Sequence, residues 1–409
     1  MKIQLSHSQK DLKGELQITG SKSESNRVLI LQALYPGITL ENLSNSDDSR
    51  VMQEALKRDS GTVDIHHAGT AMRFLTAYFA AKKGCEVILT GSNRMKERPV
   101  KLLVEALKEL GADISYLEQE GFPPLKIIGK ELRKSFVSVK ANISSQYISA
   151  LMLIAPSLPE GLEIQLDGTI TSTPYINMTL ELLHFLGIQG DFTGNEISIQ
   201  PRKSLGAKVV KIESDWSSAS YFYSLAAISE TADLKLSNYR KTSLQGDSCI
   251  TEIYKQFGVV TRFEGNSIIL EKRPCKKPRR IIENLQNAPD IAQTIAVTCL
   301  ALGIECELSG LHTLKIKETD RLVALKTEME KLGARVKITE DSLQLFPVKE
   351  LKMNISIATY NDHRMAMAFA PLALKVPLEI EDAGVVSKSY PGFWEDMEHL
   401  GFSLVKPSK

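Results

Sequence analysis

The sequence has few cysteines, and none of them is placed as a redox or metal-binding pair. The five are Cys85, Cys249, Cys275, Cys299 and Cys306. No two of them form a C-x-x-C motif and their number is odd, which argues against a disulfide framework and against a zinc site. The seven histidines are scattered apart from the neighbours His66 and His67. We therefore expect no metal centre, and a reducing, cytoplasmic location.

Charge imbalance, a signal segment and nucleotide motifs are also missing. The 50 Lys and Arg nearly balance the 49 Asp and Glu, so neither nucleic acid nor a membrane surface is expected as a partner. The first 18 residues have no apolar signal core. Residues 141–159 are uncharged but contain several polar side chains, which predicts a buried helix rather than a membrane span. The phosphate-binding motif G-x-x-x-x-G-K-[ST] is absent, and no cofactor is expected.

The sequence does contain a repeated pattern of predicted secondary structure. Each copy consists of an amphipathic helix, a Leu-Gly or Phe-Gly stop, a strand, a turn and a second strand. The stops are Gly111, Gly187, Gly258, Gly333 and Gly401, spaced by 76, 71, 75 and 68 residues. A glycine there supplies a left-handed helix cap, and because such caps are common, coincidence is the alternative explanation. A degenerate first copy is expected near residues 51–65.

This repeat predicts an α/β fold. A period of about 70 residues suits a small α/β unit, and 409 residues accommodate about six of them, which can form two domains of three. The most apolar helices, near residues 148–155 and 220–228, are expected inside, with sheets around them. Ile268 and Leu270 alternate after Gly265, as in the return strand of a hairpin.

Residues 20–27, Gly-Ser-Lys-Ser-Glu-Ser-Asn-Arg, lie directly before an apolar run and predict a helix start. A serine can cap the free N–H groups there, and the helix dipole makes that end partly positive. With Lys22 and Arg27 added, the segment suits a phosphate or carboxylate. An ordinary capped helix with a solvated Lys and Arg is the competing interpretation.

Other helix starts carry similar polar groups. They are Gly69 in Ala-Gly-Thr, Arg94 in Arg-Met-Lys-Glu-Arg-Pro, the group Ser144, Ser145 and Gln146, and the pair Ser172 and Tyr175. A glycine lets backbone approach a ligand closely, and arginine grips phosphate with two hydrogen bonds. Plain capping, or a solvated run of charges, explains each of them equally well when taken alone. Asp215, at a further helix start, is expected to be structural.

The second half of the chain adds carboxylates. Asp290 precedes an apolar helix, where it is either a cap or a general base. Glu318 and Arg321 are one helical turn apart, which fits a local ion pair or an acid beside an anion-binding arginine. Arg364 and Lys388 precede two more helices.

Six of these cations are expected to converge on one cleft, where they would repel each other without anionic ligands. They are Lys22, Arg27, Arg94, Arg321, Arg364 and Lys388. Asp290 and Glu318 are the carboxylates expected beside them, and the remaining acidic residues are interpreted as structural. The pattern predicts two small-molecule ligands that carry several negative charges between them.

At this point the chain resembles a known family, the 5-enolpyruvylshikimate-3-phosphate synthases, essentially from end to end. The motifs that carry the resemblance are GSKSESNR, AGTAMR, RMKERP, SSQYISALM, SASYF, SLQGD, PDIAQT, IKETDRL, DHRMAM and KSYPGFW. It implies two similar domains, each of three βαβαββ units with helices inside the sheets, an inside-out α/β barrel. The first domain would comprise residues 1–19 and 213–409 and the second residues 20–212, with the active site in the cleft between them.

The resemblance also implies the reaction. The enolpyruvyl group of phosphoenolpyruvate would pass to the 5-hydroxyl of shikimate 3-phosphate by addition and elimination, with release of phosphate, in the shikimate pathway of aromatic amino acid biosynthesis. A monomer that binds these small molecules is implied. Asp290 or a neighbour would take the hydroxyl proton, Glu318 would deliver a proton to the methylene, and Lys22 and Lys388 would assist.

Carried over from the family, the substrate contacts fall on two overlapping sets. For shikimate 3-phosphate they are Lys22, Ser23, Arg27, Ser144, Ser145, Gln146, Ser172, Tyr175, Asp290 and Lys317. For phosphoenolpyruvate they are Lys22, Gly69, Arg94, Gln146, Arg321, Arg364 and Lys388.

The chain departs from the family in three places. His67 and Thr313 stand where many members have Asn, and Lys315 where many have Arg, which puts one contact to each substrate in doubt. Gly69 is retained, and because a larger residue there would crowd a phosphonate analogue, inhibition by glyphosate is expected.

Two alternatives stay open on sequence. The sister transferase acting on UDP-N-acetylglucosamine carries a reactive cysteine in the loop that corresponds to residues 91–100, where this chain has none, and Cys85 is interpreted as core. A non-catalytic phosphosugar-binding protein on the same scaffold should have lost Asp290, Glu318 or Lys22, and all three are present.

Overall fold

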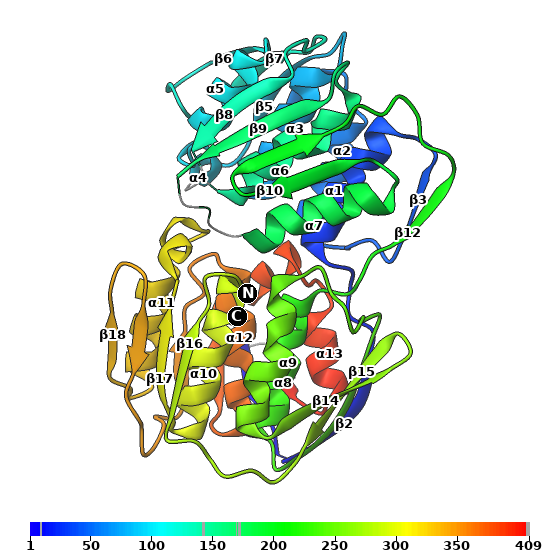
Figure 1. The fold of residues 1–409 in the computed structure, drawn as a ribbon. Coiled ribbons are helices and arrows are strands. Elements are labelled where there is room, and N and C mark those ends of the chain that lie inside the picture. The colour runs from blue at the N-terminus through cyan, green and yellow to red at the C-terminus, as the bar shows by residue number, and fades with distance from the viewer. Residues whose placement is uncertain (9, 141–143, 169, 171–172, 406–409) are drawn as a thin grey trace. The chain divides into compact units, whose positions relative to one another are not determined.

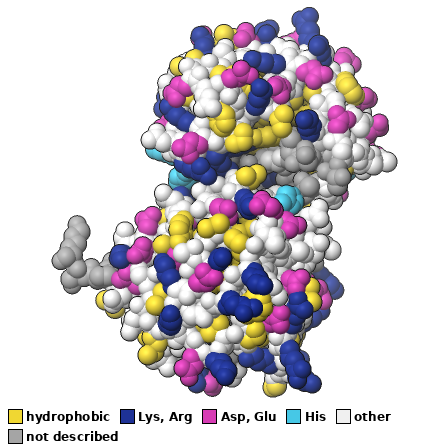
Figure 2. All heavy atoms as spheres, turned by 90° about the vertical axis from the view of Figure 1, so that its left-hand side faces the viewer, with side chains coloured by type: hydrophobic (Ala, Val, Ile, Leu, Met, Phe, Trp, Pro, Cys, Tyr) yellow, Lys and Arg dark blue, Asp and Glu magenta, His cyan; other side chains and the backbone are white. Residues whose placement is uncertain are grey.

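The computed structural model describes residues 1–8, 10–140, 144–168, 170 and 173–405. The chain forms two compact units. Unit 1 comprises Met1–Thr19 and Glu213–Lys409, and unit 2 comprises Gly20–Ile212. Within the described residues, no helix is long and apolar enough to cross a membrane. Basic and acidic side chains are interspersed over the visible face of each unit (Figure 2).

Both units repeat one module of strand, helix, strand, helix and hairpin. The first two strands pair in parallel, and the hairpin adds two antiparallel strands, so that the sheet order is first, second, fourth, third. The described residues contain six sheets, three in each unit. The expected α/β fold of two similar domains is confirmed (Figure 1). The sheets are open, so the barrel comparison applies to the layering of helices inside sheets and not to a closed strand circle.

Unit 1 contains three modules with four-stranded sheets, and in the third the N-terminal strand takes the place of the last strand of the hairpin. In sheet order, their strands are β2 (Asp11–Leu16), β13 (Thr231–Ser237), β15 (Ser267–Lys272) and β14 (Val259–Glu264); β16 (Arg280–Asn284), β17 (Glu305–Ser309), β19 (Leu343–Leu345) and β18 (Val336–Ile338); and β20 (Ile355–Ile357), β21 (Leu378–Ile380), β1 (Ile3–Ser6) and β22 (Ser403–Val405). Their α-helices are α8 (Trp216–Ile228), α9 (Ile250–Ile253), α10 (Ala292–Leu302), α11 (Arg321–Lys331), α12 (His363–Phe369) and α13 (Phe393–His399). Because β1 and β2 complete two of these sheets, the N-terminal segment belongs to unit 1.

Unit 2 contains two complete modules and a reduced one. In sheet order, the strands are β4 (Ser60–Asp64), β5 (Glu86–Thr90), β7 (Leu125–Ile128) and β6 (Asp113–Tyr116); β8 (Phe136–Lys140), β9 (Leu162–Asp167), β11 (Glu196–Ile199) and β10 (Gly190–Thr193); and β12 (Lys208–Lys211) and β3 (Ile38–Glu41). Their α-helices are α1 (Lys22–Leu34), α2 (Asp47–Leu56), α3 (Gly69–Ala81), α4 (Asn93–Lys96), α5 (Lys101–Glu109), α6 (Ser145–Ile154) and α7 (Thr173–Phe185).

The reduced module corrects one expectation. Residues 51–65 contain the end of α2 followed by a strand, as a degenerate copy should, but this strand, β4, is the first strand of the next sheet and not part of a hairpin that follows α2. The missing first strand of the reduced module is supplied by β12, which returns from the far end of unit 2 to pair in parallel with β3.

Short 3-10 helices join several elements. They are η1 (Ala155–Ser157), η2 (Gly246–Cys249), η3 (Tyr254–Phe257), η4 (Pro289–Ile291), η5 (His312–Ile316), η6 (Ala370–Leu374) and η7 (Ala383–Lys388). Four of them, η2, η4, η5 and η7, precede or contain residues of the candidate site.

The glycine stops and the buried helices follow the sequence prediction. Gly111, Gly187, Gly258, Gly333 and Gly401 have φ of 106°, 83°, 78°, 98° and 91°, the left-handed conformation that side chains with a Cβ resist. Helices apolar on all sides lie inside the unit: every residue of α12 is buried, as is every residue of α8 except Ser217. In unit 1, α8, α10 and α12 lie side by side among the sheets (Figure 1).

Candidate active site

In unit 2, α1 begins where the sequence predicted. Ser21 is its N-cap and accepts a hydrogen bond from the backbone N–H of Glu24. Lys22, the first helical residue, has its Nζ 3.5 Å from Oδ2 of Asp48 in α2, and His67 Nε2 lies 3.7 Å from Oδ1 of the same carboxylate. Sequence reasoning missed Asp48, because a carboxylate in the first turn of a helix is an ordinary dipole partner.

Arg27 is buried and held by protein groups. Its Nε donates to Thr179 Oγ1 at 2.8 Å, Nη1 to the Ser23 carbonyl at 2.8 Å and Nη2 to Ser149 Oγ at 3.1 Å. Its guanidinium also lies over the ring of Tyr175, 5.8 Å from the centroid. Arg27 is therefore not a solvated surface charge. It is a fixed group that ties α1 to α6 and α7.

Two more helix starts of unit 2 are connected by a side-chain bond. Ser144 caps α6 by accepting from the backbone N–H of Gln146 at 3.3 Å, and Ser145 is buried. The amide of Gln146 donates to Thr70 Oγ1 at 3.2 Å, next to Gly69 at the start of α3. Ser172 lies outside the described residues.

The two arginines of the 94–98 segment differ in setting. Arg94 is exposed and pairs with Glu97 at 2.8 Å, the surface ion pair that a solvated charge run predicts. Arg98 instead approaches Gly69 so closely that a Cβ added to this glycine would overlap its guanidinium. Sequence reasoning did not select Arg98, which one helical turn separates from Arg94.

In unit 1, Arg321 is the centre of a buried charge cluster. Its Nε is 2.6 Å from Oδ2 of Asp362, its Nη1 2.8 Å from Oδ1 of Asp290 and its Nη2 2.9 Å from Oε2 of Glu318. Only 2% of the Arg321 side chain is exposed. Glu318 precedes α11, whose N-cap is Asp320, so the predicted pair exists but does not span one turn of a helix.

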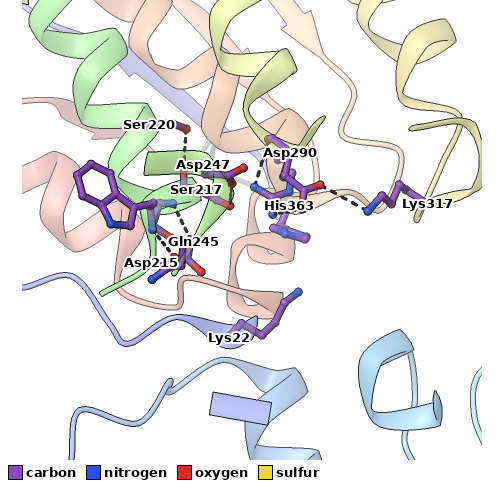
Figure 3. Close-up of polar contacts among 12 residues, drawn as sticks. Lys22, Asp215, Ser217, Ser220, Gln245, Asp247, Asp290, Lys317 and His363 are labelled. Carbon is purple, nitrogen blue, oxygen red and sulfur yellow. Dashed lines mark hydrogen bonds and ion pairs between the residues drawn. The ribbon is translucent and has the colours of Figure 1, made fainter. Parts of the chain in front are cut away.

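Asp290, in η4 before α10, is shared among three cations. Besides Arg321, Nη2 of Arg364 lies 3.2 Å from its Oδ2 and Nζ of Lys317 lies 3.6 Å from its Oδ1; Figure 3 shows the contact with Lys317. Burial raises the pKa of Asp290, but the charges of Arg364, Lys317 and Arg321 outweigh it and hold that pKa well below 3.8. In this arrangement Asp290 is ionised and a weak base.

Within their own units, four of the six predicted cations have a carboxylate beside them. Asp48 lies beside Lys22, Glu97 beside Arg94, three carboxylates beside Arg321, and Asp290 beside Arg364. Lys388 instead donates to the carbonyl of Asn361 at 2.6 Å. In unit 1, an anionic ligand of Arg321 or Arg364 therefore has to compete with these carboxylates.

Two carboxylates of this cluster were missed at the sequence level. Asp362 was interpreted as structural, yet it binds Arg321 and also caps α12 by accepting from the backbone N–H of Arg364 at 2.8 Å. Asp247, in η2, lies beside Ser217 (Figure 3) and accepts its hydroxyl hydrogen. Burial, followed by the charge of Asp290, raises the pKa of Asp247 to about 7. Nothing in its motif, SLQGD, distinguishes it from a helix-capping residue.

The remaining predicted positions have simpler settings. Asp215 caps α8 by accepting from Ser218 at 2.8 Å, as expected, and Cys85 is buried, as expected. Lys315 pairs with Glu340 at 2.6 Å. The hydroxyl of Thr313 is buried and has no hydrogen-bond partner among the described residues. The part of the chain that the structure describes contains no group of three His, Cys, Asp or Glu able to hold a metal ion.

The sequence of this chain matches known proteins over nearly its whole length. The family model for EPSP synthase (3-phosphoshikimate 1-carboxyvinyltransferase) matches residues 6–60 and 59–397. The 3-phosphoshikimate 1-carboxyvinyltransferase of Bacteroides fragilis is 46% identical over 399 residues, with 96% of each chain covered. That of Haemophilus influenzae is 36% identical over 429 aligned positions, covering 95% of this chain and 96% of the relative.

Solved structures share the fold at low identity. The EPSP synthase of Acinetobacter baumannii superposes with a TM-score of 0.78 at 21% identity, covering 99% of this chain and 100% of that one. The enolpyruvyl transferase NikO of Streptomyces tendae superposes with a TM-score of 0.76 at 14% identity, covering 100% of this chain and 99% of that one. At these identities the likeness concerns the fold alone.

Proposed function

The chain belongs to the EPSP synthase family, and we propose that it transfers the enolpyruvyl group of phosphoenolpyruvate to the 5-hydroxyl of shikimate 3-phosphate. Phosphate is released, and the reaction belongs to the shikimate pathway. The observation that carries the proposal is the match of the family model to nearly the whole chain, including every segment that contributes a charged group to the cluster around Arg321.

In the proposed reaction, the negative charges of phosphoenolpyruvate replace those of Asp290 and Glu318 beside the two arginines. Phosphoenolpyruvate brings a carboxylate and a phosphate, which compete with Asp290 for Arg364 and with Glu318 for Arg321. Nε of Arg364 is buried and has no partner among the described residues, so its present position leaves a donor unused. When an anion engages Arg364, Asp290 loses part of the positive charge that lowers its pKa, and becomes a better base.

In the proposed reaction, the 5-hydroxyl oxygen bonds to C2 of phosphoenolpyruvate while Asp290 or a neighbour takes the hydroxyl proton. Glu318 supplies the proton that converts the methylene into a methyl group, which gives a tetrahedral intermediate. Loss of phosphate and of one methyl proton then restores the double bond. The lysines Lys22 and Lys388 assist proton transfer and stabilise the charge that gathers on the phosphate.

The proposed contacts keep the two sets derived from the family. Shikimate 3-phosphate is assigned to Lys22, Ser23, Arg27, Ser144, Ser145, Gln146, Ser172, Tyr175, Asp290 and Lys317, and phosphoenolpyruvate to Lys22, Gly69, Arg94, Gln146, Arg321, Arg364 and Lys388. A monomeric state is part of the same proposal, and so is a cytoplasmic location, which the five free cysteines support.

Phosphate release tests this function. We expect purified protein to release phosphate from phosphoenolpyruvate when shikimate 3-phosphate is present, and not when UDP-N-acetylglucosamine replaces it. Release with the UDP-sugar alone would assign the chain to the sister activity. Folded protein that is silent with both acceptors would favour a non-catalytic phosphosugar-binding role.

Glyphosate should inhibit the reaction in competition with phosphoenolpyruvate. A Cβ at Gly69 would overlap the guanidinium of Arg98, so Gly69→Ala should push that side chain toward the ligand and weaken inhibition by about 10- to 200-fold, the range for one extra carbon in a fitted pocket. Gly206→Ala is the matched control, because a Cβ there meets nothing within 4 Å. Millimolar glyphosate without effect on wild-type protein would refute the prediction, as would equal inhibition of both variants.

A further inference from the structure

The segment from Ala358 to Asp362 leads directly into α12 and is held at both ends by α11. We infer that Glu328 and Tyr360 are positioning residues that fix Arg364 and Lys388 for phosphoenolpyruvate. This inference rests on the proposed function, which assigns both cations to that substrate.

Two side chains of α11, Arg321 and Glu328, bind this segment and fix the distance between its ends. Arg321 and Glu328 are seven residues apart, which places them on one face of the helix and about 10.5 Å apart along its axis. Arg321 binds Asp362 at the end of the segment. Glu328 accepts from the backbone N–H of Ala358 at 3.1 Å and from the hydroxyl of Tyr360 at 2.5 Å.

The held segment has an unfavourable backbone. Tyr360 and Asn361 are consecutive residues with φ of 53° and 59°. Asparagine tolerates this left-handed region, but a bulky aromatic residue rarely adopts it. The chain closes this turn with a hydrogen bond from the N–H of Asp362 to the carbonyl of Thr359 at 2.8 Å. Such a conformation persists only where the surroundings impose it, and the bond from Tyr360 to Glu328 is a tertiary contact able to do so.

Two groups of the turn, the Asp362 carboxylate and the Asn361 carbonyl, bind residues of the candidate site. Asp362, its last residue, caps α12 through the N–H of Arg364 at 2.8 Å. The carbonyl of Asn361 accepts from Nζ of Lys388 at 2.6 Å. A change in the conformation of the turn therefore moves Arg364 and Lys388 together. Glu328 acts on both cations through the turn, because its hydrogen bonds are to Ala358 and Tyr360.

A simpler role for Glu328 has to be separated from this one. The residue is fully buried, and Lys331 donates to its Oε2 at 2.7 Å. Glu328 could therefore stabilise the fold alone, since a buried carboxylate needs a cation and hydrogen bonds. That role predicts lower stability and equal effects on both substrates. Positioning predicts an effect on phosphoenolpyruvate alone, because Arg364 and Lys388 belong only to its set.

The test uses Tyr360→Phe, Glu328→Met and the double variant in the full-length enzyme, because methionine is close to glutamate in size and cannot accept the bond from Tyr360. Tyr360 is 39% exposed, so Phe fits without repacking a core. We expect KM for phosphoenolpyruvate to rise about tenfold in each single variant, and KM for shikimate 3-phosphate to stay within about twofold. Because both changes remove the hydrogen bond between Tyr360 and Glu328, the double variant should be no worse than the more impaired single variant.

The control is Tyr223→Phe, which removes another hydroxyl of unit 1, bonded to Thr261 at 2.7 Å. Stability is followed by fluorescence of Trp216 and Trp394, the two tryptophans of the chain, both in unit 1. Unchanged KM for phosphoenolpyruvate in Tyr360→Phe would overturn the inference, as would an equal rise for both substrates with reduced stability. Wild-type protein without the transferase activity would instead refute the proposed function.

Discussion

Glu318→Gln should lose about 10²- to 10⁴-fold in kcat, the contribution typical of a positioned acid or base, while both substrates still bind. Oε2 of Glu318 accepts from Nη2 of Arg321 at 2.9 Å. The amide oxygen of glutamine can accept the same bond, so the orientation of Arg321 is kept. The amide cannot release a proton to the methylene carbon. One negative charge leaves the cluster, so anion binding should be equal or tighter.

The kinetic pattern expected from Glu318→Gln is therefore a fall in kcat without a rise in KM, measured with both substrates varied. Glu252→Gln is the matched control, because Glu252 forms an ion pair with Lys255 at the same i,i+3 spacing on an exposed surface. Turnover near the wild-type rate in Glu318→Gln would remove Glu318 as the acid. A large rise in KM with unchanged kcat would make it a binding residue only.

The local part of the structure was predictable from sequence. The cap at Ser21, the left-handed glycines and the return strand at residues 267–272 depend on interactions within a few residues, and all were found as expected. The apolar helices were predicted to be inside because they have no polar face. Local chemistry specifies such features wherever the rest of the chain lies.

For the charge cluster, the sequence predicted which types of residue take part but not which carboxylate pairs with which cation. Asp290 and Arg364 are 74 positions apart, and Arg321 meets Asp362 across 41 positions. Which carboxylate neutralises which cation is decided by the packing of α10, α11 and α12, and no local pattern encodes it. Asp48 and Asp362 were missed because each resembles an ordinary helix-capping residue in the sequence.

The same packing shifts the pKa values of two buried carboxylates in opposite directions: it lowers that of Asp290 and raises that of Asp247. Three cations hold Asp290 ionised, with its pKa well below 3.8. Burial of Asp247, followed by the negative charge of Asp290 nearby, disfavours its ionised form, and the charge of Arg364 and the hydrogen bond from Ser217 offset this only in part. A carboxyl that binds a proton more tightly when folded makes stability depend on pH.

Asp247→Asn should stabilise the unliganded protein at pH 8 and have little effect at pH 4. The folded pKa of about 7 exceeds the ordinary 3.8, so the stability from this group is complete below pH 3.8 and is lost as pH rises through 7. The loss corresponds to about 4 kcal/mol at most. Urea unfolding followed by Trp216 and Trp394 fluorescence at both pH values measures it, with Asp233→Asn at an exposed site as control. Equal effects at the two pH values would show that Asp247 is ionised at no cost, and that the charge of Arg364, which lowers the pKa of Asp247, already compensates for its burial.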